Sequence, residues 1–166
     1  MSTRCLIGAD TEVGTRLVYV HHDGYPLSRY GKLPTLARLV ARDGLSRVVA
    51  TLLSTPSGWS SFDGEPPAEL PAFSSDGRFE IVPGYGVRYT LTPLDHPALG
   101  KGYVQGDTEY TTPATAPDAD FAYVYVLDTE GRVRWAENSG AAWADLDWQQ
   151  MTLADIEKLG SMDEAQ

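Results

Sequence analysis

The fold is decided by residues 3–26, TRCLIGADTEVGTRLVYVHHDGYP. Two short β-rich runs, Thr3 to Ala9 and Thr15 to His22, flank a segment whose Asp10 and Gly14 suit a hairpin turn. In the second run, residues 17, 19 and 21 point to one side of a sheet and residues 18, 20 and 22 to the other. Because both sides are apolar, this hairpin is expected to lie in the centre of a sheet.

Two amphipathic helices are expected directly after this hairpin. Pro34 suits the first turn of a helix, and apolar residues follow at helical spacing until the chain reaches Gly44. A second apolar stripe then recurs at the spacing of one helix face: Leu45, Val48, Val49, Leu52 and Leu53. Each helix therefore has one face to bury against the sheet.

The rest of the chain predicts a few more short elements. Strands are expected in residues 79–92 and 121–135, each segment with a Gly-containing turn, and a short helix is expected at residues 153–159. Residues 57–77 and 93–119 read as loop excursions, and residues 161–166 as a frayed acidic tail. The expected architecture is a single α+β domain over residues 1–160. It has a mainly antiparallel sheet of five or six short strands, with two consecutive helices packed on one face.

Charge and cysteine content restrict the possible partners. The chain of 166 residues has a net charge of -10, and residues 107–166 carry 13 acidic but only three basic side chains. Such a field repels nucleic acid and anionic membrane, so neither is expected as a partner, whereas a basic protein is attracted. The single cysteine, Cys5, cannot form an internal disulfide, and no apolar run near it is long enough for a membrane span. We therefore expect a cytoplasmic protein.

Reactive side chains gather at the end of the second run, between Tyr19 and Pro26. Asp23 can orient the His21 imidazole as a general base, although an Asx turn would also explain these two residues. The basic and aromatic residues around the turn can instead bind a small anionic molecule such as a nucleotide. The ligand-binding candidates are Tyr19, His21, Asp23, Tyr25, Arg29, Tyr30 and Lys32.

A metal site is the less favoured interpretation of the same segment. It would combine His21 or His22 and Asp23 with Asp95 and His96, which are ligand types that suit Zn or Mn. Nothing in the sequence brings residues 95–96 near residues 21–23. We therefore expect neither a metal nor another cofactor.

The segment Tyr19 to Pro26, with its hairpin before and two helices after, resembles a group of small uncharacterised phage and prophage proteins. Their common segment reads Tyr-x-His-Trp-Asp-Gly-Tyr-Pro. The resemblance covers residues 1–56 and, weakly, the hairpin at 121–135. His22 stands where the group usually has Trp, which argues against a catalytic role for His22. The resemblance implies a phage-encoded accessory protein in the host cytoplasm and no particular reaction.

The function expected from these observations is that of a non-enzymatic phage accessory protein that binds a host component. That component is either a small anionic molecule, such as a nucleotide signal, or a host protein contacted through the acidic C-terminal third. The alternative is a small hydrolase or phosphodiesterase that uses His21 and Asp23 as catalytic residues, with or without a metal. The sequence does not define the oligomeric state.

Overall fold

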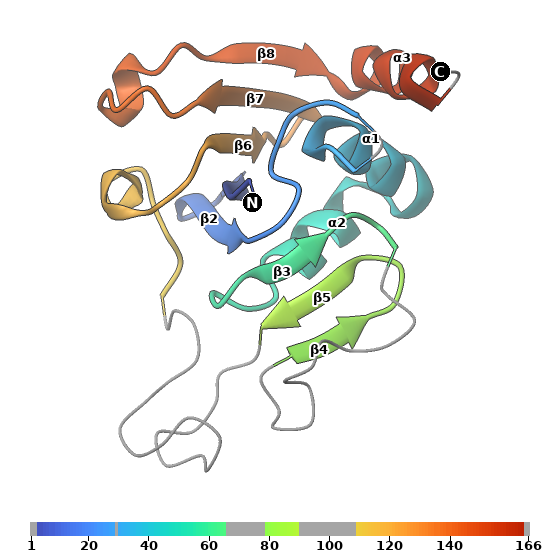
Figure 1. Cartoon of the computed structure of the whole chain (residues 1–166), viewed down its shortest axis with the longest axis horizontal. Coiled ribbons are helices and arrows are strands. Elements are labelled where there is room, and N and C mark those ends of the chain that lie inside the picture. Colours follow the sequence, from blue (N-terminus) through green and yellow to red (C-terminus); the bar gives the residue numbers. More distant parts are fainter. Residues whose placement is uncertain (1–2, 29, 66–78, 90–108, 165–166) are drawn as a thin grey trace.

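Eight strands form one mixed sheet in the computed structural model, which describes residues 3–28, 30–65, 79–89 and 109–164. Their order across the sheet is β4-β5-β3-β2-β1-β6-β7-β8 (Figure 1). The strands are β1 (Cys5–Thr11), β2 (Gly14–Val20), β3 (Trp59–Phe62), β4 (Phe79–Val82), β5 (Gly86–Tyr89), β6 (Tyr123–Leu127), β7 (Arg132–Glu137) and β8 (Gln149–Thr152). The helices are α1 (Lys32–Asp43), α2 (Leu45–Leu52) and α3 (Leu153–Glu164), with one-turn 3₁₀ helices η2 (Ala116–Asp118) and η3 (Trp143–Asp145).

The chain is α+β, but the predicted sheet of five or six mainly antiparallel strands is wrong. Strands β1 and β6 pair in parallel, as do β2 and β3, while the other neighbouring strands are antiparallel. The alternation of side chains shows where a strand runs but not which strand it pairs with, so these long-range parallel pairings left no local signal. Strand β3 lies inside a predicted loop excursion, and β8 is a polar edge strand without apolar alternation.

The central position of the first hairpin is confirmed. Strands β1 and β2 pair from Cys5↔Val20 to Thr11↔Gly14, and they occupy the middle of the sheet. Val18 and Val20 belong to the core under the helices, whereas Leu17 belongs to the core on the opposite face. The two apolar faces of the hairpin are therefore both buried.

Both predicted helices form, and they cover one face of the sheet. Leu36 of α1 and Val48 of α2 are fully buried in a core that also contains Ile7 of β1 and Leu127 of β6. Helix α3 packs beside α1 at the end of the sheet that carries β8 (Figure 1). It extends to Glu164, past the short helix expected at residues 153–159. Among the described residues, no helix has the length and apolar character needed to cross a membrane.

The opposite face of the sheet is covered by irregular structure. A second core cluster joins Leu6, Leu17 and Val124 to residues of the segments that contain η2 and η3, namely Ala116 and Leu146. Segments near the end of the chain thus seal the face that the helices leave uncovered.

Candidate functional site

The segment between β2 and α1 forms a firmly held corner beside β3. The backbone N–H groups of His21 and His22 donate to the carbonyls of Trp59 and Ser60, at 3.0 Å each, so both histidines continue alongside β3. Further along, the N–H groups of Lys32 and Leu33 donate to the carbonyls of Tyr25 and Pro26. Backbone hydrogen bonds therefore hold both ends of this corner.

Gly24 fixes the middle of the corner against the first strand. Its N–H donates to the Thr3 carbonyl at 2.8 Å, and its own carbonyl accepts a 2.7 Å bond from the buried Tyr125 hydroxyl. A Cβ atom at this position would lie 2.8 Å from backbone atoms of Thr3 and Arg4. Glycine is needed here because only a residue without a side chain permits this close approach.

His21 is paired with Tyr19. The Tyr19 hydroxyl lies 2.6 Å from His21 Nδ1, and both side chains are half-buried. Burial lowers the pKa of His21 below its usual range, and the charges of His22 and Arg4 lower it further. The imidazole is therefore mainly neutral at neutral pH.

Asp23 is held by a different partner. Its backbone adopts φ 58°, in the left-handed region, and its carboxylate accepts a 2.8 Å hydrogen bond from the Tyr25 hydroxyl. In the catalytic pair considered for the alternative function, His21 thus forms its hydrogen bond with Tyr19, and Asp23 forms its hydrogen bond with Tyr25. The structure records no hydrogen bond between the described residues His21 and Asp23.

Lys32 lies in the core. It is fully buried, and its Nζ donates to the carbonyls of Phe62 at 2.7 Å and Tyr30 at 3.3 Å. Burial lowers its pKa, although the nearby carboxylates of Asp63 and Asp23 act in the opposite direction. The Lys32 amino group therefore donates its hydrogen bonds to backbone carbonyls inside the molecule and is not accessible to a ligand at the surface. Tyr30 is half-buried, and the candidate Arg29 lies outside the described residues.

The residues considered for a metal site do not converge in the described part of the chain. Asp95 and His96 lie outside it, and within it no group of three or more His, Cys, Asp or Glu side chains is arranged to hold a metal ion. Cys5 is fully buried, and its burial raises the pKa of the thiol to about 12. A thiol with so high a pKa is protonated and unreactive at neutral pH.

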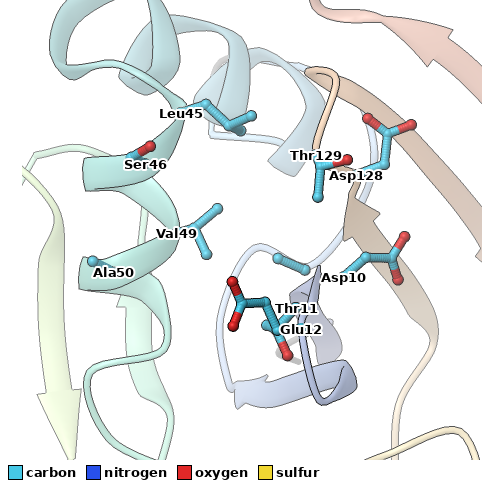
Figure 2. Close-up of a pocket in the computed structure, with 10 residues that line it drawn as sticks. Asp10, Thr11, Glu12, Leu45, Ser46, Val49, Ala50, Asp128 and Thr129 are labelled. Atoms are coloured by element: carbon cyan, nitrogen blue, oxygen red, sulfur yellow. The ribbon is translucent and has the colours of Figure 1, made fainter.

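A pocket of about 470 Å³ lies at a different edge of the sheet, and we call it the β1–α2 pocket. It opens between the end of β1, the turn after β6 and one side of α2 (Figure 2). Its lining residues are Ala9, Asp10, Thr11, Glu12, Leu45, Ser46, Val49, Ala50, Asp128 and Thr129. In open α/β sheets, ligands bind at the carboxyl ends of parallel strands, and here the parallel strands β1 and β6 both end at the pocket.

Two of the three carboxylates around the pocket are already neutralised. Asp10 accepts bonds of 2.7 and 3.0 Å from the Arg134 guanidinium, which lower the pKa of its carboxyl group. Burial alone would raise the pKa of Asp128, but hydrogen bonds from the backbone and side chain of Arg132 hold it below its usual range. Figure 2 shows both carboxylates directed away from α2.

Glu12 is the third carboxylate, and it faces the pocket. It sits on the exposed tip of the β1–β2 hairpin, and its carboxylate is directed toward α2 (Figure 2). No ion pair or hydrogen bond of its side chain is recorded among the described residues. Leu45 and Val49 project toward the same space from α2. The pocket therefore combines an apolar wall with one uncommitted negative charge.

Sequence reasoning missed this pocket because its residues come from three distant segments. Asp10 and Asp128 both appear as turn residues, and Glu12 is a polar residue of a hairpin tip. Only the parallel pairing of Ala9 with Leu127 brings the two turns together. The sequence does contain a signal for the pocket, since an aspartate directly follows a buried strand residue in each segment: Asp10 after Ala9 and Asp128 after Leu127.

Comparison with known proteins gives no match to this chain among family models, curated proteins or solved structures.

Proposed function

We propose that this protein is a non-enzymatic binding protein whose partner is a basic host protein that docks at the β1–α2 pocket. The observation that carries this proposal is the combination of an apolar wall on α2 with the uncommitted carboxylate of Glu12. Ligand pockets are typically apolar with a few placed polar groups, and the volume of about 470 Å³ is ordinary for such a pocket.

Charge favours a basic partner. The net charge of -10 is concentrated in residues 107–166, which include the Asp128 turn at the pocket. A negative field of this kind raises the rate at which a positively charged protein meets the surface. It also disfavours a small anion, the other ligand expected from the sequence.

An exposed apolar side chain at the rim supports docking of a protein. Val13 follows Glu12 on the hairpin tip and is 74% exposed, so its side chain is accessible to a partner. An interface with a charged contact and an apolar anchor side by side suits a protein surface better than a small solute. The resemblance to phage and prophage proteins suggests that this partner belongs to the host cell.

The alternative function, a hydrolase that uses His21 and Asp23, has less support. Catalysis by such a pair would need the Asp23 carboxylate to orient the His21 imidazole. Asp23 instead accepts its hydrogen bond from Tyr25, while His21 Nδ1 is 2.6 Å from the Tyr19 hydroxyl. Binding therefore fits the arrangement better than acid–base catalysis.

Site-specific photo-crosslinking tests the proposal. The photoreactive residue p-benzoylphenylalanine replaces Val13 in one variant and Leu27 in a matched control. Within the described part of the chain, Leu27 is the other exposed large apolar residue; it is 49% exposed and belongs to the β2–α1 corner. In host cells, we expect one basic host protein to be crosslinked from position 13 and not from position 27. Crosslinking from position 27 alone, or from neither position, would reject docking at the pocket.

The captured protein is then purified and its affinity for the uncrosslinked chain is measured. Ala50→Arg places a positive charge and extra bulk at the exposed edge of the pocket, so we expect it to weaken binding at least about tenfold. Ala41→Arg makes the same change at an exposed site on α1 that does not line the pocket. Equal affinities of the two variants would contradict the proposed site.

A further inference from the structure

We infer that the β1–α2 pocket takes the side chain of one arginine of the partner, with the guanidinium on Glu12 and the aliphatic stem along α2. This inference rests on the proposed function and names the chemical group that anchors the partner.

The guanidinium of the partner's arginine is placed on Glu12 because the carboxylate of Glu12 has no partner of its own among the described residues. Asp10 and Asp128 are saturated by Arg134 and Arg132, so Glu12 is the acidic group of the pocket that can accept a new cation. A single free carboxylate is too few ligands for a divalent metal but matches one organic cation. A guanidinium can bind it through two parallel N–H···O bonds.

The methylene groups of the partner's arginine are placed along the apolar wall of the pocket. Leu45, Val49 and Ala50 of α2, together with Ala9 of β1, present an apolar surface beside the carboxylate. Arginine buries its methylene groups along apolar surface while its charged end stays with a polar partner. Ser46 and Thr129 also line the pocket, and their hydroxyl groups can bond to polar groups of the partner other than the guanidinium.

The position along α2 is consistent with a bound cation. The N-terminal end of a helix carries a partial positive charge, which would repel a guanidinium placed near Leu45. In Figure 2, Glu12 lies across the pocket from α2 at the level of Ala50, in the second half of the helix, whereas Leu45 lies at the other end of the pocket. The cation can therefore occupy the carboxylate side of the pocket without facing the helix terminus.

Arginine is preferred to lysine because of its shape and hydration. The guanidinium is planar, offers a rigid fork of donors that fits a carboxylate, and is more weakly hydrated than an ammonium group. It therefore loses less solvation on entering a pocket that is partly apolar. A lysine would contact Glu12 as a point charge and could not form the two parallel N–H···O bonds of a guanidinium.

The inference is tested on the isolated protein with three capped amino acids: N-acetyl-arginine methylamide, its lysine analogue and its citrulline analogue. Citrulline has the shape of arginine but no charge. Binding is followed by NMR from the amide signals of the pocket residues. We expect the arginine probe to bind saturably with a Kd on the order of millimolar, and the citrulline probe at least about tenfold more weakly. Equal binding of arginine and citrulline, or of arginine and lysine, would overturn the assignment.

A pair of glutamate variants localises the charge effect. Glu12→Gln should weaken binding of the arginine probe about five- to tenfold. Glu130→Gln removes the same charge from the neighbouring turn, where the carboxylate pairs with Arg132 and does not line the pocket, so its effect should be much smaller. Equal effects of the two changes would mean that the general negative field, not Glu12, attracts the probe, and would overturn the inference.

The two tests can fail separately. A host protein crosslinked at position 13 without binding of the arginine probe would leave the proposed function standing and reject the arginine anchor. Saturable binding of the arginine probe without any crosslinked host protein would reject the protein partner and retain the guanidinium specificity of the pocket.

Discussion

At the scale of single residues, Lys32 is a basic group that the fold places in its core. Its side chain is fully buried, and its Nζ is satisfied by the carbonyls of Phe62 and Tyr30. The nearby Asp63 is half-buried, and its burial raises the pKa of its carboxyl group. Lys32 thus links the start of α1 to the end of β3 through polar contacts inside an apolar core. Removing the charge from water nevertheless carries a penalty that depends on pH.

The lowered pKa of Lys32 predicts a specific pH dependence of stability. Between this lowered pKa and the ordinary value of 10.5, the unfolded chain binds a proton that the folded protein does not. The contribution of Lys32 to the free energy of unfolding therefore rises with pH across this interval. In Lys32→Met that contribution is absent. The free energy of unfolding of the wild type, relative to that of the variant, should therefore increase as the pH rises. Denaturant unfolding between about pH 7 and about pH 10 measures it.

Lys158→Met is the matched control for this prediction. Lys158 is an exposed lysine of α3. The free energies of unfolding of Lys158→Met and of the wild type should therefore differ by a constant amount over the same pH range. If Lys32→Met also differs from wild type by a constant amount, Lys32 keeps its ordinary pKa in the folded protein.

At the scale of elements, the β2–α1 corner depends on a contact from a strand about a hundred residues later. The Tyr125 hydroxyl on β6 donates to the Gly24 carbonyl at 2.7 Å in a buried setting. The corner is thus attached to the sheet by a side chain as well as by its own backbone bonds to Thr3 and α1. Its rigidity follows from tertiary contacts that its own sequence does not contain.

Tyr125→Phe should loosen the corner without changing the packing of the ring. The change leaves the buried Gly24 carbonyl without its donor, which should reduce the free energy of unfolding by about 1–3 kcal/mol. The amide protons of Lys32 and Leu33, which bond to carbonyls of the corner, should exchange faster with solvent. Tyr123→Phe, on the half-buried neighbour in the same strand, is the control. Unchanged exchange at Lys32 and Leu33 in Tyr125→Phe would show that the backbone bonds alone hold the corner.

Local patterns predicted some elements well and others not at all. The hairpin at 5–20, both amphipathic helices and the hairpin at 123–137 have strong periodicity, and each of them forms. Strand β3 has only four residues, and the serines and glycine around it suggest a loop. The sequence also identified Asp23 and His21 as neighbours, but it could not show that Tyr25 and Tyr19 engage them separately. Which side chains hydrogen-bond to each other depends on their three-dimensional positions and cannot be read from their spacing in the sequence.

At the scale of the whole molecule, the two halves of the sheet are joined through the central hairpin. Strand β2 connects to β3 and the outer strands β5 and β4, while β1 connects to β6, β7 and β8. The core under the helices includes residues from both halves, such as Trp59 of β3 and Val133 of β7. A continuous core across the sheet predicts that both halves unfold together.

This cooperativity can be measured with 5-fluorotryptophan. Trp59 reports on the β3 half and Trp135 on the β7 half, and their ¹⁹F signals can be assigned with single Trp→Phe variants. In a urea titration of the wild type we expect both native signals to disappear with the same midpoint. Two clearly separated midpoints would show that the halves are independent folding units.

The central position of the first hairpin also affects how the chain is synthesised. β1 and β2 leave the ribosome before the other strands of the sheet, yet the parallel neighbour of β1 is complete only when residue 127 has been added. At a translation rate of about 5–20 residues per second, the interval is on the order of ten seconds. During that time one edge of an apolar hairpin exposes unpaired N–H and C=O groups. The nascent chain therefore presents an aggregation-prone edge that a chaperone can shield until β6 emerges.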